Sequence, residues 1–387
     1  MIICVFALVK RYRQPLAKIG RNGIIAKGTY VISGETKQVM TEKTQELIQK
    51  AYGSLKDGDA NSAMRFLKDA LELDFEHEEV IYALKCLNWW LEKIKRLDDF
   101  CDPYERGVYI LSQWESYYSF LDRIAETTPQ QEADSLQDAG LAKGTGHLKE
   151  ASLQKGGALP FEATDSCQYA IKRFVFSRAF NFFMALLSDE ANQQDPVLLL
   201  QAGRCCKGAG EWEEALKYLE HANRLKREDS AILSELADIY ALIGDERAAK
   251  VLFREAFYLD PSGIDLSSME SEMIIRLRDK VRGSGRKGSE LPEWIPVWGY
   301  TEGVFSIKRE LKPVEFGRLK QSILSLENEY RSKNGGDPLV KPRLLNRYLW
   351  LMDHYEHNRD TSGLLDETML KIKFIDPVVY DKITGVI

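Results

Sequence analysis

The residues best suited to chemistry lie in a short run where acidic residues and histidines alternate. The run reads DHYEH and places Asp353, His354, Glu356 and His357 near the expected end of a helix. Because residues three apart share a helix face, the two histidines could bind one metal ion. The histidine patterns of zinc peptidases are not matched, and no third ligand is evident nearby. Charge at a helix C-terminus is the simpler interpretation, so the sequence predicts no metal site.

A second pattern is the segment GSGRKG, in which Gly283, Gly285 and Gly288 have the spacing of a dinucleotide-binding loop. That loop needs a preceding strand, and here the segment follows an expected helix, which favours a linker. A basic run surrounds it. The run leaves two interpretations open, a solvated helix end and a contact for an acidic partner. Its members are Arg276, Arg278, Lys280, Arg282, Arg286 and Lys287.

Groups for acid–base or nucleophilic catalysis are scarce. The chain has five histidines and neither a Ser-His-Asp arrangement nor a nucleophile-elbow motif. Its six cysteines form no C-x-x-C pair, and several fall at expected helix-core positions, where reduced thiols pack as small apolar groups. We therefore expect no enzyme, no metal and no cofactor. An enzyme domain within 291–387 is the remaining alternative.

The composition is that of a folded protein, with 44% apolar residues and a net charge of −6. The negative charge argues against nucleic acid as a partner. The first nine residues are apolar, but basic residues follow them, which is the reverse of a signal peptide, and the run is too short to span a bilayer. We expect a cytoplasmic protein without a membrane partner. A further hypothesis is that the native chain starts at Met40.

The expected helices that would position a site recur at a constant interval along the sequence. This interval equals the separation of Gly210 from Gly244. A fixed period of this length is the signature of stacked structural repeats. Small residues at set places in the repeat let helix backbones approach closely, and glycine at the end of a helix adopts the left-handed cap cheaply. The registered pairs are Leu199/Leu233, Gly203/Ala237, Gly210/Gly244, Ala215/Ala249, Ala222/Ala256 and Leu225/Leu259.

The unit 230–263 resembles the tetratricopeptide repeat (TPR), a hairpin of two antiparallel helices. The unit 196–229 keeps most of the family pattern, with Cys206 in the tyrosine position and Arg227 in the proline position. A third unit, 44–77, keeps part of it. The clearest unit carries Leu233, Leu236, Ala237, Tyr240, Ala249, Phe253, Ala256 and Pro261 at the positions that the pattern specifies.

The resemblance implies a concave groove lined by the first helix of each repeat. Within it, Arg204 and Lys207 could grip an acidic peptide. The lysine and asparagine clamp of chaperone-binding family members is absent, which argues against a chaperone co-factor. The expected groove residues are Tyr52, Lys56, Leu200, Arg204, Lys207, Ser234 and Asp238.

The fold we predict is all-α, an interrupted α-solenoid of TPR hairpins with a divergent helical C-terminal region. Residues 127–160 are polar and rich in Gly, Gln and Ser, which predicts a flexible linker or insertion. Residues 291–311 contain two prolines and two tryptophans without a helical period, which predicts an extended segment. The predicted segments are 1–39, 41–126 (first repeat block), 127–160, 161–282 (TPR block with a capping helix), 283–312 (linker and Trp-rich irregular segment) and 313–387 (C-terminal helices).

The function this predicts is a protein–protein interaction scaffold or adaptor that presents a TPR groove. Its partner would be a protein or peptide, acidic if Arg204 and Lys207 bind it, and a homo-oligomer is left open. An alternative is a structural subunit of a large assembly. The tract LPEWIPVWGY and the degenerate repeats are similar to spirochaetal TPR proteins of the flagellar collar, which would place the chain in the periplasm or at the inner membrane.

Overall fold

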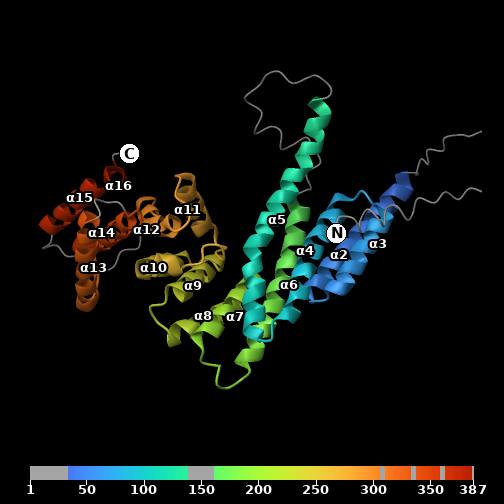
Figure 1. The fold of residues 1–387 in the computed structure, drawn as a ribbon, viewed down its shortest axis with the longest axis horizontal. Helices are drawn as coiled ribbons and strands as arrows, with labels where there is room; N and C mark the ends of the chain where they lie inside the picture. Colours follow the sequence, from blue (N-terminus) through green and yellow to red (C-terminus); the bar gives the residue numbers. More distant parts are fainter. Residues whose placement is uncertain (1–33, 138–160, 306–309, 333–336, 358–361, 386–387) are drawn as a thin grey trace, which may run out of the picture. The chain divides into compact units, whose positions relative to one another are not determined.

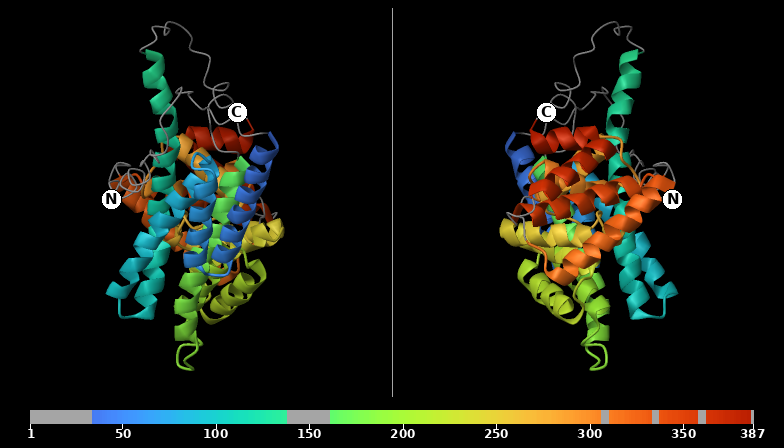
Figure 2. Two further views of the ribbon diagram at one scale, coloured as in Figure 1. Left: turned by 90° about the vertical axis from the view of Figure 1, so that its right-hand side faces the viewer. Right: turned by 90° about the vertical axis from the view of Figure 1, so that its left-hand side faces the viewer.

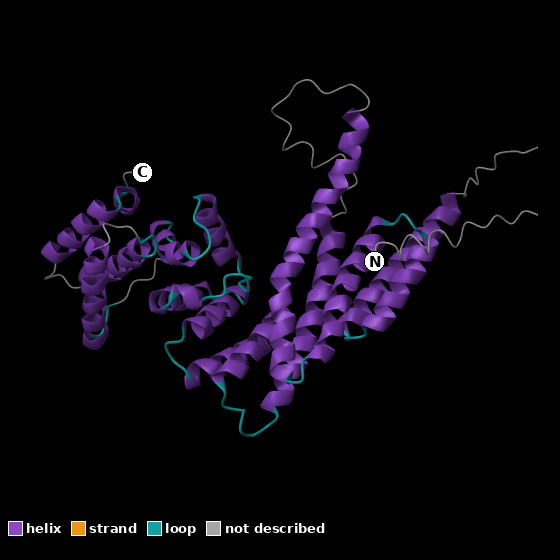
Figure 3. Cartoon of the chain, viewed as in Figure 1, coloured by secondary structure: helices purple, strands orange, loops and turns teal. Residues whose placement is uncertain are grey.

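The computed structural model describes residues 34–137, 161–305, 310–332, 337–357 and 362–385. In these residues the chain forms fifteen α-helices and two short 3-10 helices, and no strand (Figures 1 and 3). Residues 1–43 and 44–387 form two compact units, and only 34–43 of the first are described. The predicted all-α fold is confirmed.

The first five α-helices precede the clear repeats. α2 and α3 form an antiparallel hairpin, and α6 packs on both α4 and α5 (Figure 1). The elements are α2 (Gly34–Lys56), α3 (Ala60–Leu73), α4 (Glu78–Ile94), η1 (Lys95–Asp99), α5 (Pro103–Gln137) and α6 (Phe161–Leu187).

The period of the sequence appears directly in the helix bounds. The first hairpin begins at Pro196 and the second at Ser230, and every later bound is displaced by the same interval. Asp195 and Asp229 cap the first helices of the two hairpins through their side chains, which explains why both begin where they do. The helices are α7 (Pro196–Gly208), α8 (Trp212–Leu225), α9 (Ser230–Leu242) and α10 (Glu246–Leu259).

The same turn closes three hairpins. Gly58, Gly210 and Gly244 all have φ between 81° and 92°, in the left-handed region where glycine is unstrained. In each turn, the amide after the glycine bonds a carbonyl five positions back, as in a Schellman motif; for Asp245 and Tyr240 this distance is 2.8 Å. The turn at Gly58 thus groups the hairpin α2–α3 with the two clear repeats.

A second group of helices follows the repeats. α12 packs on α10, α11, α14 and α16, and α13 to α16 gather in one group in both views of Figure 2. Residues 264–271, between η3 and α11, are a loop, so the capping helix α11 begins only at Glu272. The elements are η3 (Pro261–Gly263), α11 (Glu272–Gly283), α12 (Glu290–Thr301), α13 (Pro313–Ser332), α14 (Val340–His357), α15 (Ser362–Ile375) and α16 (Pro377–Thr384).

The prediction of an extended Trp-rich segment is wrong, because residues 290–301 form α12 with Pro296 inside it. Proline in a helix interior costs about 3 kcal/mol. α12 buries Leu291, Trp294, Ile295 and Val297, and each large apolar side chain contributes about 1.5–3 kcal/mol. Burial therefore outweighs the proline. Because α12 is buried nearly all round, its sequence shows no amphipathic period.

Two other predicted boundaries also differ. Residues 34–39 belong to α2, and α5 continues to Gln137 through the start of the predicted linker. The Gln, Glu and Ala residues of 130–137 are compatible with a helix, which an interpretation based on polarity missed. The rest of the predicted linker, 138–160, and residues 1–33 lie outside the described residues.

The buried apolar side chains form two clusters. One unites α2–α8 and part of α9, and the other unites the rest of α9 with α10–α16. Cys86, Cys167, Cys205 and Cys206 are buried free thiols, as the sequence predicts, whereas Cys101 is exposed. Among the described helices, none is long and apolar enough to cross a bilayer.

Candidate functional site

The first helices of the two clear repeats, α7 and α9, present their polar side chains to the loop 264–271. This loop lies over the face that the sequence identifies as the groove. Lys207 is 2% exposed, and Ser234 and Asp238 are fully buried. The expected groove surface is therefore partly covered by the chain itself.

Lys207 is bonded entirely within the protein. Its Nζ lies 2.5 Å from Glu235 Oε2, 2.7 Å from Asp238 Oδ2 and 2.8 Å from the carbonyl oxygen of Ser268. A lysine ammonium has three N–H donors, and these three acceptors satisfy them. Lys207 is thus an internal cation that ties α7 to α9 and to the loop.

The two carboxylates also hold the loop. Asp238 accepts from the amides of Glu270 and Ser271, each at 2.8 Å. Glu235 accepts from Ser268 Oγ at 2.6 Å and from Arg204 Nε at 2.8 Å. Glu235 is not among the residues expected from the sequence. Its signal was that Arg204 and Asp238 occupy equivalent positions of successive repeats, which places opposite charges on adjacent helices, and that Glu235 lies one helical turn before Asp238.

Burial and charge oppose each other at this network. Burial alone would lower the pKa of Lys207, but the carboxylates of Asp238 and Glu235 outweigh it and raise that pKa above its ordinary value. Burial alone would raise the pKa of Asp238, but Lys207 and the loop amides lower it. Both groups are therefore charged at neutral pH, and the network is an ion pair.

The remaining predicted groove residues are spread along the chain. Tyr52 is buried on α2 and donates to Glu79 Oε1 at 3.1 Å, Leu200 is buried, and Lys56 is exposed with its Nζ 5.1 Å from the centre of the Tyr169 ring. Ser234 donates to the carbonyl of Ala231 in its own helix. The structure unites Arg204, Lys207 and Asp238, and does not bring Tyr52 or Lys56 into that network.

An open cleft of about 400 Å³ adjoins the network. Its apolar wall comes mainly from α5, where Val108 is 37% and Tyr118 50% exposed. Its polar wall is the loop 264–271, and Arg204 and Lys207 lie at its base. The lining residues are Val108, Leu111, Ser112, Trp114, Glu115, Tyr118, Phe176, Gln201, Arg204, Lys207, Asp265, Ser267, Ser268, Met269 and Glu270.

The charges that line this cleft are unevenly neutralised. Arg204 and Lys207 pair with Glu235, and Glu270 pairs with Lys172 at 2.6 Å. Among the described residues Glu115 and Asp265 form no ion pair, although Asp265 helps to raise the pKa of the Arg204 guanidinium. The cleft therefore combines an exposed apolar wall with two carboxylates that form no ion pair in the described part of the chain.

Asp353 and His354 of the acidic and histidine run are buried and serve packing, whereas Glu356 is exposed. Asp353 is fully buried, pairs with Arg254 and accepts from Tyr300 Oη at 3.1 Å. His354 is buried, and its Nδ1 accepts from the amide of Leu311 at 3.2 Å. No group of three or more metal-binding side chains occurs among the described residues. The side chain of His357 is outside the described set.

The basic run around the glycine-rich segment is largely paired on the surface. Arg276 pairs with Glu272, Lys280 with Glu302, and Arg286 with Glu290. Gly285 and Gly288 have positive φ in the turn between α11 and α12, and a helix precedes them where a nucleotide-binding loop needs a strand. The structure therefore gives these glycines a turn in place of a nucleotide-binding loop.

Comparison with known families adds one finding. Residues 231–262, which run from α9 through α10 into η3, match the tetratricopeptide repeat. Among curated proteins, none matches the chain with significant similarity.

Proposed function

We propose that this chain, a tetratricopeptide-repeat protein, acts as a protein–protein interaction scaffold or adaptor. The repeat supports a protein partner in general. The single observation that carries the proposal is the cleft between α5 and the loop 264–271, where apolar side chains are exposed beside α7. Clefts of this kind accept a segment of a partner protein.

The chemistry of the cleft favours a partner segment with an apolar face and a basic side chain. Val108 and Tyr118 offer apolar surface, and Glu115 and Asp265 offer negative charge. An acidic partner, expected from Arg204 and Lys207, has less support because both cations are already paired with internal carboxylates. The buried thiols favour a reducing compartment, so we propose a cytoplasmic location.

A peptide-display selection on the whole protein tests this proposal. We expect enrichment of peptides that combine aliphatic or aromatic residues with lysine or arginine. Tyr118→Ala should weaken the binding of the selected peptides by about tenfold, because it removes part of the apolar wall. The matched control is Phe374→Ala on α15, which removes an aromatic side chain that is 85% exposed and lies outside the cleft.

The charge is tested separately with Glu115→Lys, for which Glu213→Lys on α8 is the control. Only Glu115→Lys should weaken the binding of basic peptides. The proposed site would be refuted if acidic peptides were enriched. It would also be refuted if neither Tyr118→Ala nor Glu115→Lys changed the affinity for the selected peptides. Self-association of the purified chain without peptide binding would favour the alternative proposal of a structural subunit in a large assembly.

A further inference from the structure

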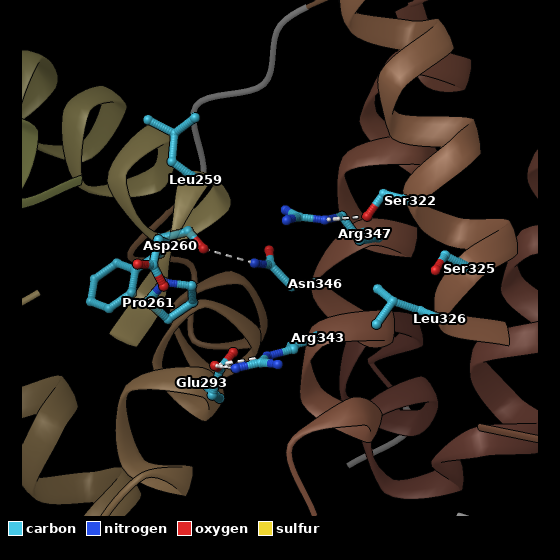
Figure 4. Close-up of a pocket in the computed structure, with 11 residues that line it drawn as sticks. Leu259, Asp260, Pro261, Glu293, Ser322, Ser325, Leu326, Arg343, Asn346 and Arg347 are labelled. Atoms are coloured by element: carbon cyan, nitrogen blue, oxygen red, sulfur yellow. Dashed lines mark hydrogen bonds and ion pairs between the residues drawn. The ribbon is translucent and has the colours of Figure 1, made fainter. Parts of the chain in front are cut away.

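A second cavity of about 400 Å³ lies between the end of the repeats and the C-terminal helices, and none of its lining residues lines the first cleft. Figure 4 shows α10, η3 and α12 on one side and α13 and α14 on the other. Its lining residues are Phe257, Leu259, Asp260, Pro261, Glu293, Ser322, Ser325, Leu326, Arg343, Asn346 and Arg347.

Glu293 gives this cavity an unsatisfied acceptor. Arg343 donates to its Oε1 from Nε at 2.8 Å and from Nη2 at 2.5 Å. The other oxygen, Oε2, is buried and has no hydrogen-bond partner among the described residues, and the residue is 1% exposed. Leaving a buried carboxylate oxygen unpaired is costly, so a donor from outside the protein would stabilise it.

Arg347 gives the cavity a cation that lies 4.1 Å from the centre of the Tyr258 ring but has no carboxylate in an ion pair among the described residues. Its Nη1 donates to the Tyr258 carbonyl at 2.6 Å, and its Nε donates to Ser322 Oγ at 3.2 Å. Burial lowers the pKa of its guanidinium, although Tyr258 and Glu293 act in the opposite direction. No carboxylate pairs with Arg347 among the residues that the structure describes.

A structural role accounts for part of this arrangement. Arg347 and Asn346 bond the carbonyls of Tyr258 and Phe257, which end α10 and lack helical partners. Capping uses one of five guanidinium N–H groups, and Ser322 uses a second. Three donors remain, and the positive charge has the Tyr258 ring but no carboxylate beside it among the described residues. Capping also leaves the unpaired oxygen of Glu293 unexplained.

We propose that this cavity binds a small molecule that carries a carboxylate and, on the adjacent carbon, a hydrogen-bond donor, as an apolar α-amino acid does. The carboxylate pairs with Arg347, and the donor bonds Glu293 Oε2. Figure 4 places Asn346 between these two groups, and the walls at Phe257, Leu259 and Leu326 accept the apolar side chain. Inorganic phosphate fits less well, because much of it is doubly negative at neutral pH and would be repelled by Glu293, and it has no apolar part for the walls.

Calorimetric titration of the whole protein with three matched ligands tests the inference. L-leucine has both groups, 4-methylpentanoate lacks the amine, and 3-methylbutylamine lacks the carboxylate. We expect saturable binding of leucine and at least about tenfold weaker binding of the other two, as the loss of one charged hydrogen bond predicts. Inorganic phosphate is the fourth ligand and should bind more weakly than leucine.

Three variants locate the binding. Arg347→Gln should weaken the binding of leucine by at least about tenfold. Ser325→Trp, at an exposed position on α13, should block the cavity without altering its charges, and it keeps the test valid if Arg347→Gln unfolds. Arg331→Gln removes an exposed arginine of the same helix and should have no effect.

Several results would overturn the inference. They are the absence of saturable leucine binding to the wild type, equal binding of 4-methylpentanoate, tighter binding of phosphate, or leucine binding that survives Ser325→Trp. Water would then be the occupant at Glu293 Oε2. None of these results bears on the peptide cleft, whose residues lie on other helices.

Discussion

Lys207 illustrates how the neighbourhood of a residue decides its role. In the sequence it is one of three cations, with Lys56 and Arg204, on an expected binding surface. In the structure it bonds Glu235, Asp238 and the loop carbonyl of Ser268. A charge in this setting stabilises only while its partners remain, because each partner alone would be an unpaired buried ion.

Replacement of Lys207 by methionine tests this role. Lys207→Met keeps the length of the side chain but leaves Asp238 without its cation and Glu235 with Arg204 alone. We expect a loss of about 3–5 kcal/mol in the free energy of unfolding, measured by urea denaturation. Lys217→Met, which removes an exposed lysine paired with Glu214, should change stability little. Equal effects of the two variants would mean that the network contributes nothing.

Acid should weaken the same network in a defined range. The pKa of Asp238 is lowered from its ordinary value of 3.8, so its stabilisation is present above that value and is lost as pH falls through the folded pKa. The difference in unfolding free energy between wild type and Asp238→Asn should therefore be constant from about pH 5 upward and shrink below about 3.8. A difference that stays constant down to about pH 2 would contradict this assignment.

High pH should weaken the network by deprotonating Lys207, whose pKa is raised from 10.5. Its contribution is present below that value and is lost only as pH rises through the higher folded pKa. The two shifts together predict that the loop 264–271 stays attached to α7 and α9 throughout the neutral range. At this scale no switch near neutral pH is expected from the network.

At the scale of elements, two glycines of the repeats act in different ways. Gly244 has φ of 92°, and a Cβ there would meet nothing within 4 Å, so only its backbone conformation matters. A Cβ on Gly203 would lie 2.6 Å from Leu219 Cγ, so packing of α7 on α8 matters there. The next repeat has Ala237 in the same position, opposite Phe253, which shows that this contact depends on the neighbouring side chain.

A double-mutant cycle separates the two effects. Gly244→Ala should cost about 1–2 kcal/mol from the left-handed backbone, and Gly203→Ala about 1–3 kcal/mol from overpacking. Adding Leu219→Ala should remove most of the second cost and none of the first. The measurement is the unfolding free energy of each single and double variant. The assignment would fail if Leu219→Ala coupled equally to both glycine substitutions.

At the scale of the whole molecule, a buried ion pair joins the repeats to the C-terminal helices. Arg254 of α10 pairs with Asp353 of α14, and Tyr300 of α12 donates to the same carboxylate. The Arg254 guanidinium also lies 4.4 Å from the centre of the Trp350 ring. The C-terminal helices therefore continue the core of the last repeat.

Asp353→Asn should loosen this junction. We expect a loss of about 3–5 kcal/mol and faster hydrogen exchange in α12 and α14, because Arg254 loses its charged partner. Exchange in α3 and α4, which belong to the other apolar cluster, should not change. Asp366→Asn, at an exposed position of α15, is the control. Uniform acceleration of exchange across both clusters would argue against a local junction.

The repeating elements could be predicted from the amino-acid sequence. Gly210 and Gly244 mark the turns, and the constant spacing of the repeats places α7 to α10, because these features depend on local backbone conformation and on contacts between adjacent helices. The roles of Lys207, Glu293 and α12 emerge from the three-dimensional fold. The acceptors of Lys207 come from another repeat and a loop, the open oxygen of Glu293 depends on Arg343 in α14, and the proline of α12 is tolerated because that helix is buried. Such long-range contacts leave no period in the sequence, and they built both candidate sites.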